Sequence, residues 1–367
     1  MSNITRRGFI GAAAAAGMAA ALTGCSSSGG SSASASASAS SASASASAAS
    51  ASASASASAS AAASASASAA AKGAALRFVS GGEAGTYYAL ATLIAQHANA
   101  NAGTNITAVS SGGSQANVNE LEDGTAHIAF CQSDVEAYAF EGTNLFKDQG
   151  AVTVFSTVAN LYEEQIQIIT CDSSIKSVAD LKGKNVSIGA AGSGVYFNAI
   201  DVLGAYDITE KDITPTYQSF GDSADSLKDG KIDAAFIVAG APTSAVTDLS
   251  TTKQAYLVAI DDEHAEKLVA ASPYYNKATI KAGTYTGMTE DVPTLSVGAV
   301  VIAADSVSED DVYALVSDIY ENLDELAGQH DKFKEFSVEK GASVTAVPYH
   351  KGAAKYFAEK GKTVATK

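Results

Sequence analysis

Four short turns of glycine, serine and threonine, each following a strand-like run, most constrain what this chain can fold into. They occupy residues 81–86, 110–114, 192–194 and 239–240. In an open α/β sheet, ligands bind at the carboxyl ends of the strands, where bare backbone and helix N-termini point N–H groups outward. One such turn often only ends a helix or lets a strand and a helix pack. Four together predict a site whose main-chain donors surround an anion.

The segments around these turns alternate between strand and helix patterns. ALRFVSG is a strand, and an apolar stripe at helical spacing follows it over residues 87–94. The next unit predicts a strand from Asn105, a helix that stops at Gly124, and a strand that ends at residues 132–134. Alternation of this kind favours a largely parallel sheet flanked by helices.

The same unit occurs again later in the chain. Residues 185–206 read as strand, glycine turn and helix, and residues 214–242 as strand, helix and strand. ELEDGTAHIAF and SLKDGKIDAAF carry the same residue types at Leu121/Leu227, Asp123/Asp229, Gly124/Gly230, Ala129/Ala235 and Phe130/Phe236. We therefore expect two similar α/β lobes.

Two apolar runs, residues 165–172 and 294–305, are the candidates for extended strands that join the lobes. The predicted division is 76–172 for the first part of lobe 1, 173–278 for lobe 2, and 279–367 for the return to lobe 1 and the C-terminal helices. Within the last segment, Ser308 and Asp311 resemble a capping box before one long amphipathic helix.

The N-terminal segment reads as an export signal and a tether. Residues 1–24 contain paired arginines and a short apolar run directly before Cys25, which is typical of a twin-arginine signal peptide that ends in a lipobox. An uncleaved membrane anchor is the alternative, although the apolar run is shorter than the roughly 20 residues that span a bilayer. Residues 25–75, mostly serine and alanine, predict a lipidated cysteine and a disordered linker. The folded part is expected outside the cytoplasm, anchored to the membrane.

Charge excludes one class of partner. The formal net charge is −16, and loss of Arg6 and Arg7 with the signal makes it −18. Such a chain is not expected to bind nucleic acid. Arg77 is the only arginine that remains after processing, so a binding site has almost no guanidinium to offer a carboxylate.

Cys131 and Cys171 are left after Cys25 is assigned to lipid. A disulfide fits an exported protein, but each cysteine closes an apolar strand-like run, where a buried thiol is the more common role. Both alternatives stay open, and the buried thiols are favoured.

Signals for catalysis are weak. GAAGSG has the spacing GxxGxG rather than the dinucleotide-binding GxGxxG, and Ser193 lacks the GxSxG context of a nucleophile. The histidines are dispersed, so no metal site or cofactor is expected. Asp134 and Glu136 are assigned a solvated or capping role at a strand end.

Several tyrosines are candidates for a cleft. Tyr87 falls on the apolar stripe, whereas Tyr88 falls off it and is freer to face a ligand. Tyr162, Tyr196 and Tyr217 stay unassigned between packing and binding.

Five ordered motifs over residues 76–361 resemble the TAXI solute-binding subunits of TRAP (tripartite ATP-independent periplasmic) transporters. They are GGEAGTYYALATLIAQ, SSGGSQANVNELEDGTAHIAFCQSDVEAYAFEG, SVADLKGKNVSIGAAGSGVYFNAIDVLGA, LKDGKIDAAFIVAGAPTSAV and VPYHKGAAKYFAEKG. The resemblance implies a two-lobed type II periplasmic-binding-protein fold, with two mostly parallel sheets, two crossing hinge strands and a ligand in the cleft.

The resemblance also implies a function and a set of residues. The family delivers glutamate, glutamine or related dicarboxylates to a TRAP membrane permease, without catalysis. Its cleft motifs fall on Gly85, Thr86, Tyr87, Gly113, Ser114, Gln132, Ser133, Gly192, Ser193 and Gly194. Tyr88 and Gly240 join these candidates from the turns themselves. Glu83 departs from the family pattern and would either repel an acidic ligand or bind its amino group. His350 is expected to help dock the last helix.

Two other functions stay open. One is a sensory or adhesive lipoprotein that reports a ligand to a partner. The other is an exported hydrolase on the same fold that uses Ser193 or Asp134.

Overall fold

The computed structural model describes residues 73–367. Its strands are β1 Ala75–Val79, β2 Asn105–Val109, β3 Ile128–Gln132, β4 Phe155–Thr170, β5 Asn185–Ser187, β6 Thr214–Thr216, β7 Ala234–Ala239, β8 Tyr256–Val258, β9 Asn276–Ile280 and β10 Val292–Ala304. Its α-helices are α1 Thr86–Asn101, α2 Ser114–Glu122, α3 Ser133–Glu141, α4 Gly194–Ala205, α5 Phe220–Lys228, α6 Ser244–Thr252, α7 Asp262–Ala271, α8 Glu309–Glu321, α9 Leu323–Gln329, α10 Val338–Gly341 and α11 Lys351–Glu359. Short 3-10 helices lie at Asn144–Phe146, Val178–Leu181, Glu210–Asp212 and Asp331–Glu335.

The predicted signal peptide, the lipidation of Cys25 and nearly all of the predicted linker lie outside the described residues. No helix within residues 73–367 is long and apolar enough to span a membrane.

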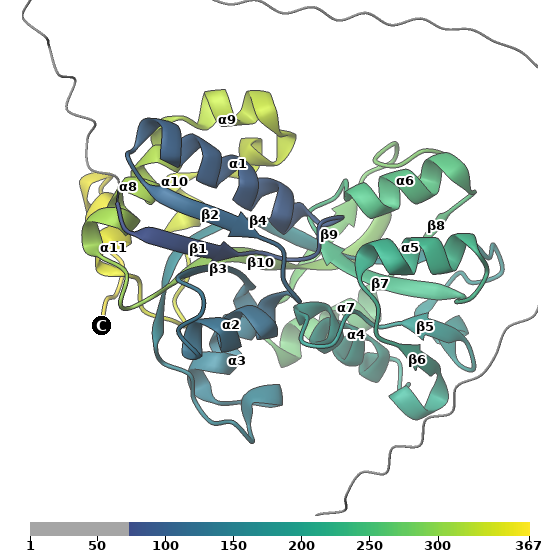
Figure 1. Ribbon diagram of the computed structural model, residues 1–367. Helices are drawn as coiled ribbons and strands as arrows, with labels where there is room; N and C mark the ends of the chain where they lie inside the picture. The colour runs from purple at the N-terminus through teal and green to yellow at the C-terminus, as the bar shows by residue number, and fades with distance from the viewer. Residues whose placement is uncertain (1–72) are drawn as a thin grey trace, which may run out of the picture. The chain divides into compact units, whose positions relative to one another are not determined.

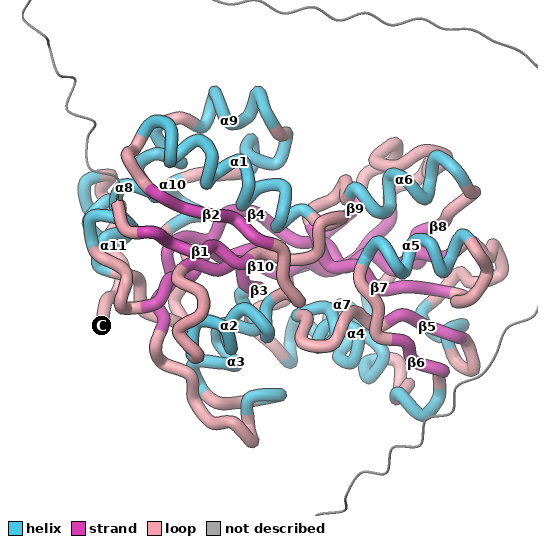
Figure 2. Tube along the Cα trace, viewed as in Figure 1, coloured by secondary structure: helices cyan, strands magenta, loops and turns pink. Residues whose placement is uncertain are grey.

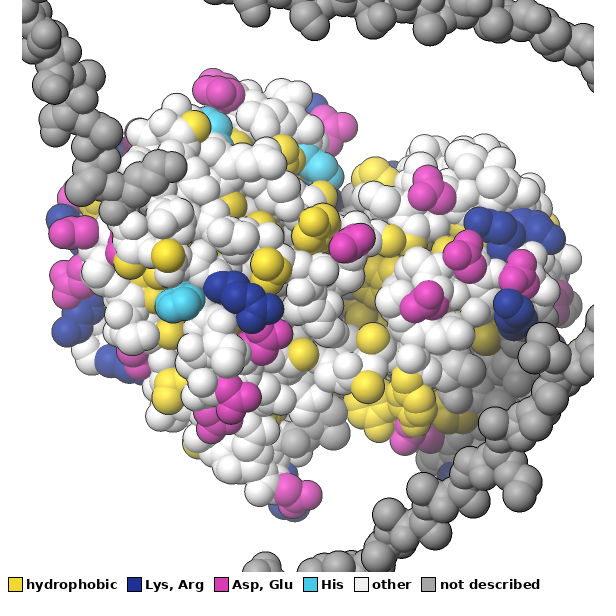
Figure 3. Space-filling view, viewed as in Figure 1, with side chains coloured by type: hydrophobic (Ala, Val, Ile, Leu, Met, Phe, Trp, Pro, Cys, Tyr) yellow, Lys and Arg dark blue, Asp and Glu magenta, His cyan; other side chains and the backbone are white. Residues whose placement is uncertain are grey.

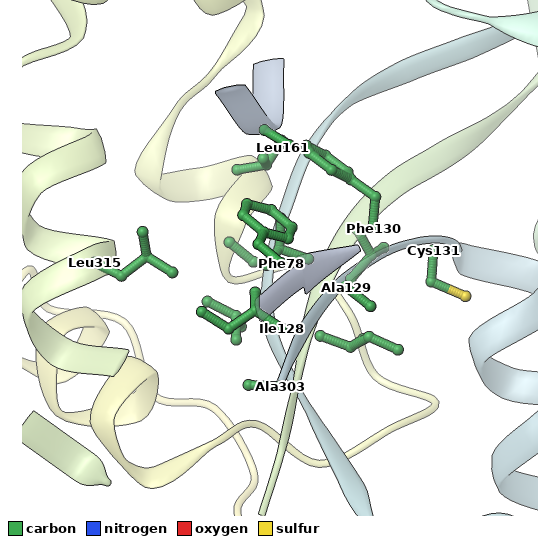
Figure 4. Close-up of a cluster of buried hydrophobic side chains, with 14 of the residues drawn as sticks. Phe78, Ile128, Ala129, Phe130, Cys131, Leu161, Ala303 and Leu315 are labelled. Atoms are coloured by element: carbon green, nitrogen blue, oxygen red, sulfur yellow. The ribbon is translucent and has the colours of Figure 1, made fainter. Parts of the chain in front are cut away.

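The first lobe is built on strands in the order β2-β1-β3-β10-β4. β1 pairs in parallel with β2 and β3, whereas β10 lies antiparallel between β3 and β4. Figure 1 shows α1 on one face of this sheet and α2 and α3 on the other. Phe78 stacks on Phe130 with ring centroids 5.3 Å apart, and Figure 4 shows both rings gathered with Leu161 while Cys131 points away from them.

The second lobe has strands in the order β6-β5-β7, followed by the second half of β4 and then β8. Alternate side chains of β7 enter two separate cores: Phe236 and Val238 pack with α4 and α7, and Ile237 packs with α5 and α6. Figure 2 shows these helix pairs on opposite sides of the strands. A strand covered on both faces is apolar at every position, which explains the run AAFIVA.

The two lobes share one strand order. In lobe 1 the order is β2, β1, β3, then β10 from the crossing pair, and then β4. In lobe 2 the order is β6, β5, β7, then β4 from the crossing pair, and then β8. In both lobes the crossing strand runs antiparallel to the strand before it. The sequence repeat falls at equivalent places, because Gly124 and Gly230 follow α2 and α5 with φ of +69° and +70°. Phe130 and Phe236 lie in the third strands β3 and β7. The predicted fold class, with two similar lobes and two crossing strands, is confirmed.

β4 and β10 are the crossing strands, and they pair with each other between the lobes. Their hydrogen bonds join the sheets of both lobes into one continuous sheet. β4 begins at Phe155 rather than at the predicted Gln165. Asn160, Glu163 and Glu164 interrupt the apolar pattern before Gln165, so the pattern did not indicate the first half of the strand.

The helix predicted after Ser308 begins as expected, with the Ser308 hydroxyl accepting from the Asp311 N–H at 3.0 Å. The prediction of one long helix is wrong, because α8 ends at Glu321 and α9 begins at Leu323. The Asn322 side chain donates to the Asp318 carbonyl at 2.8 Å. Asparagine competes in this way for backbone groups and favours helix ends.

Candidate functional site

A cavity lies between the lobes, at the carboxyl ends of β1, β3 and β7. It offers about 80 Å³ of free space, where one water needs roughly 10–15 Å³, so it has room for a small solute. Figure 3 shows the furrow between the lobes on one face, with hydrophobic side chains gathered along it. The lining residues are Gly81, Gly82, Gly85, Thr86, Tyr87, Ser111, Gly112, Gly113, Ser114, Gln132, Glu164, Ala190, Ser193, Gly194, Val195, Gln218, Ser219, Phe220, Val238 and Ala239.

Three helices begin at this cavity without a side-chain cap. The residues before α1, α2 and α4 are Gly85, Gly113 and Ser193, and none of them has a side chain that accepts a hydrogen bond from the helix it precedes. A fourth helix at the cavity, α5, is capped by Ser219, and helices elsewhere include both capped ones, such as α7 and α8, and uncapped ones, such as α6 and α9. Uncapped N-termini leave orphan N–H donors and a partial positive charge. Their convergence on one cavity makes it attractive to an anion.

Two buried side-chain oxygens at the cavity have no partner. They are Gln132 Oε1 and Ser193 Oγ, in residues that are 2 % and 6 % exposed. A buried polar atom without a partner costs about 1–3 kcal/mol. Gln132 Oε1 lies directly against the Cα of Gly194, where a Cβ would clash with it. A larger residue at position 194 would therefore displace the Gln132 side chain from its present position.

Glu164 adds a carboxyl group from the crossing strand β4. The residue is 2 % exposed, and the Tyr87 hydroxyl donates to its Oε2 at 2.7 Å. Burial raises the pKa of Glu164 well above its usual range, against the lowering effect of that hydrogen bond. Among the described residues, no lysine, arginine or histidine lines the cavity. The cavity thus combines main-chain donors with one buried carboxyl.

The lobes are closed around the cavity by hydrogen bonds that cross between them. The Ala116 N–H donates to the Gly192 carbonyl at 2.9 Å, and the Thr86 hydroxyl donates to the Gly240 carbonyl at 3.0 Å. Gly113, with φ of +101°, lies so close that a Cβ there would be 3.3 Å from the Cα of Ser193. These contacts form only when the two lobes meet.

A second group of crossing contacts lies behind Gln132. The Gln132 side-chain amide donates to Asn198 Oδ1 at 3.0 Å. Asn198 Nδ2 donates to Asp134 Oδ2 at 2.9 Å and to the Tyr275 hydroxyl at 3.0 Å. The Tyr275 hydroxyl donates in turn to Asp201 Oδ2 at 2.7 Å. This network connects the β3–α3 junction of lobe 1 to α4 of lobe 2.

Asp134 and Glu136 were expected in a solvated or capping role at a strand end, and they do lie in the first turn of α3. The solvated alternative is wrong, because both side chains are fully buried. Burial raises the pKa of Asp134 to about 7, although its hydrogen bond from Asn198 lowers it. Burial also raises the pKa of Glu136 well above its usual range. The sequence shows them at a strand end, but α3, β4 and lobe 2 cover that end.

Most of the predicted site residues lie along the cavity, and four lie elsewhere. Those along it are Gly85, Thr86, Tyr87, Gly113, Ser114, Gln132, Ser193 and Gly194. Tyr88, Ser133, Gly192 and Gly240 are not among the lining residues. Gly192 and Gly240 instead supply carbonyls to the crossing hydrogen bonds. The Ser133 hydroxyl accepts from the Gly298 N–H at 2.9 Å.

The expected preference of Tyr88 over Tyr87 for the cleft is wrong. Tyr87 is buried, lines the cavity and stacks on Phe130 with centroids 4.5 Å apart. It serves as core and cavity wall at once, because its ring packs inward while its hydroxyl reaches Glu164. A place on the apolar stripe of the helix therefore did not prevent Tyr87 from lining the cavity.

Sequence reasoning missed Glu164 and the segment formed by Gln218, Ser219 and Phe220. The two adjacent glutamates in an otherwise apolar run, LYEEQIQII, were a usable signal for Glu164. Ser219 caps α5 by accepting from the Asp222 N–H at 3.2 Å. Nothing in the sequence around Gln218 distinguishes it from an ordinary loop residue.

The other candidates lie away from the cavity. Glu83 is exposed beside Asp222 and Asp225 in an outer groove. Tyr162 is buried and stacks with Phe336. Tyr196 and Tyr217 both donate to Glu210, and neither lines the cavity.

Residues 73–367 contain two cysteines and five histidines. Cys131 is a buried free thiol, and Cys171 is a half-buried free thiol, so no disulfide joins them. No group of histidine, cysteine and carboxylate side chains in this part of the chain could hold a metal ion.

His350 caps the last helix as expected, because its Nδ1 accepts from the Gly352 N–H at 3.2 Å.

The chain course is similar to several solved structures. One is the alkanesulfonate-binding protein SsuA from Xanthomonas axonopodis pv. citri, at 19 % identity and a TM-score of 0.46, covering 79 % of this chain and 85 % of that one. Another is a putative L-cystine ABC transporter protein from Listeria monocytogenes, at 14 % identity and a TM-score of 0.45, covering 72 % and 98 %. The model of the NMT1-like family matches residues 78–361, most of the chain. The protein therefore belongs to the NMT1-like family.

Proposed function

We propose that this protein is the extracytoplasmic solute-binding subunit of a transporter and that it holds a small acidic solute between its lobes. The observation that carries the proposal is the convergence of three uncapped helix N-termini, with two unpartnered buried oxygens, on one closed cavity. An anionic group of the solute would accept from the amides that follow Gly85, Gly113 and Ser193.

The energetics are adequate for this role. Each helix N-terminus contributes about 0.3–1 kcal/mol to anion binding, and up to about 2 kcal/mol when partly buried. A micromolar complex requires about 8 kcal/mol. The remainder would come from burial of the solute and from hydrogen bonds to Gln132 and Ser193, both of which lack partners at the cavity. Closure of the lobes excludes water and strengthens these contacts.

The buried carboxyl of Glu164 narrows the solute class. An ammonium group placed beside Glu164 would favour the ionised carboxyl and form an ion pair with it, whereas a dicarboxylate without a donor would meet a neutral carboxyl and gain no ion pair there. We therefore place amino acids such as glutamate and glutamine ahead of simple dicarboxylates. The Ser193 hydroxyl has no hydrogen-bond partner, and in particular no base to activate it, which favours binding over hydrolysis.

The partner in this proposal is a TRAP-type permease, as the five TAXI-like motifs imply. Export by the twin-arginine signal and a lipid on Cys25 would keep the protein at the membrane surface. Uptake in membrane vesicles tests the partner directly: transport should need an ion gradient and persist without ATP. Uptake that stops when ATP is depleted would point to an ABC-type permease instead.

Binding is tested by thermal unfolding of the full chain with acidic amino acids, glutamine, dicarboxylates, neutral sugars and polyamines. A solute at 100 times its dissociation constant should add about 2.7 kcal/mol to the free energy of unfolding. We expect stabilisation by amino acids and none by polyamines. Stabilisation by neutral sugars alone would contradict an anion-binding cavity.

A further inference from the structure

The two ends of the Gln132 side-chain amide have different surroundings. Its Nε2 donates across the lobe boundary to Asn198 Oδ1 at 3.0 Å. Its Oε1 has no partner and is buried at the cavity. A primary amide has two donors on one end and an acceptor on the other, so the end that Gln132 presents to a solute is the acceptor.

Asn198 determines that orientation, because both protons of its Nδ2 are already committed. One goes to Asp134 Oδ2 at 2.9 Å and the other to the Tyr275 hydroxyl at 3.0 Å. Tyr275 gives its own proton to Asp201 at 2.7 Å, so its oxygen accepts from Asn198. Only Asn198 Oδ1 is left to face Gln132. A reversed Asn198 would place its oxygen against the Tyr275 oxygen, whose proton is already donated to Asp201, and this contact between two acceptors is unfavourable.

The network also depends on closure of the lobes. Gln132 and Asp134 lie at the junction of β3 and α3, and Asn198 lies on α4 in the other lobe. When the lobes separate, Gln132 loses its partner and its amide is free to rotate. The preference for a donor on the solute is therefore created at the moment of closure.

We propose that Asn198 is a positioning residue that holds Gln132 as a hydrogen-bond acceptor in the closed cavity, and that the solute must present an N–H or O–H group to it. This inference rests on the proposed function and deepens it. It assigns a specificity role to residues that do not themselves line the cavity, because Asn198, Asp134 and Tyr275 act only through Gln132.

The test compares two probes that differ in one group, L-glutamate with an amino group and 2-oxoglutarate with a keto oxygen. Calorimetric titration of the wild-type chain should show at least about a tenfold preference for glutamate, since a buried acceptor without a donor is costly. Asn198→Ala frees the Gln132 amide, so the preference should fall several-fold. The double exchange Asn198→Asp with Asp134→Asn still offers Gln132 an acceptor oxygen and restores an N–H to carboxyl contact between positions 134 and 198, so it should keep most of the preference. Loss of affinity for both probes by the same factor in Asn198→Ala would indicate a purely structural role and overturn the proposal.

A second measurement applies even if neither probe binds or Asn198→Ala fails to fold. The side-chain NH₂ signal of Gln132, assigned by its disappearance in Gln132→Glu, should exchange slowly in the ligand-free wild-type chain under conditions where the lobes are closed. Exchange as fast as that of a free amide would overturn the role of Asn198. Absence of binding by every acidic solute, together with a protected Gln132 amide, would contradict the proposed function alone.

Discussion

The hydroxyl of Tyr87 donates a hydrogen bond of 2.7 Å to the carboxyl of Glu164, and both side chains line the cavity between the lobes. Tyr87 comes from the first turn of α1, and Glu164 from the strand that crosses between the lobes. The pair therefore connects a helix N-terminus of one lobe to the hinge. Burial keeps the carboxyl protonated at pH values where an exposed glutamate is ionised.

Binding of glutamate is expected to release a proton from Glu164. Burial raises its pKa and so favours the neutral carboxyl, and an ammonium group placed beside it lowers a carboxyl pKa by about 1–3 units. Titration calorimetry in two buffers of different ionisation enthalpy measures the number of protons released. We expect net release by the wild-type chain and none by Glu164→Gln, with Tyr87→Phe as the control that keeps the carboxyl. Equal release by wild type and Glu164→Gln would assign the proton to another group.

The pH dependence of stability should reflect Asp134. Its pKa is about 7 in the folded chain against 3.8 for an ordinary aspartate, so folding takes up a proton between these values. The free energy of unfolding therefore falls as pH rises from about 4 to about 7, by up to about 4 kcal/mol from this group. Asp134→Asn should flatten that slope in urea unfolding at pH 5 and pH 8. Glu136 and Glu164 act in the same direction and should leave a residual slope in this variant.

Gly113→Ala should hold the lobes apart. A Cβ at this position would be 3.3 Å from the Cα of Ser193 in the other lobe, and φ is +101°. Gly124→Ala is a control for positive φ without a contact between the lobes, because its φ is +69° and nothing lies within 4 Å of its Cβ. Both changes strain the backbone, by about 1 kcal/mol or more, but only Gly113→Ala should weaken solute binding, by about tenfold or more. Small-angle scattering with saturating solute would reveal the open form, and wild-type compaction of Gly113→Ala would contradict this role.

Ser193 and Ser308 precede α4 and α8 but serve different purposes. Ser308 caps its helix, so Ser308→Ala should cost about 1 kcal/mol of stability without changing affinity. Ser193 makes no cap hydrogen bond, and its hydroxyl is buried without a partner. Ser193→Ala should therefore leave stability unchanged or slightly raised while it weakens binding several-fold. Denaturant unfolding and calorimetry on the same samples separate the two effects, and a large stability loss in Ser193→Ala would show a structural hydroxyl.

The local sequence pattern was sufficient to predict the repeating strand, turn and helix units of this protein. Periodicity and glycine placement predicted β1 with α1, β2 with α2 and β3, and β5 with α4, because strand, turn and helix form from neighbours in the chain. The repeat at Gly124 and Gly230 indicated two similar lobes for the same reason. Most turn residues that line the cavity were predicted, since parallel strands bring their carboxyl ends to one edge of a sheet.

The tertiary structure decided what happens where the lobes meet. Thr86 and Gly240 are 154 positions apart, and Asn198 and Asp134 are 64 apart, so no local pattern records their contacts. Burial of Asp134 and Glu164 likewise depends on segments distant in the chain. By itself, the sequence determined the folding units and the edge of the sheet at which the candidate site lies. Closure of the two lobes determined which polar groups are shielded from water there. Because they are shielded together, the glycine turns, the Glu164 carboxyl and the Gln132 amide form one candidate site.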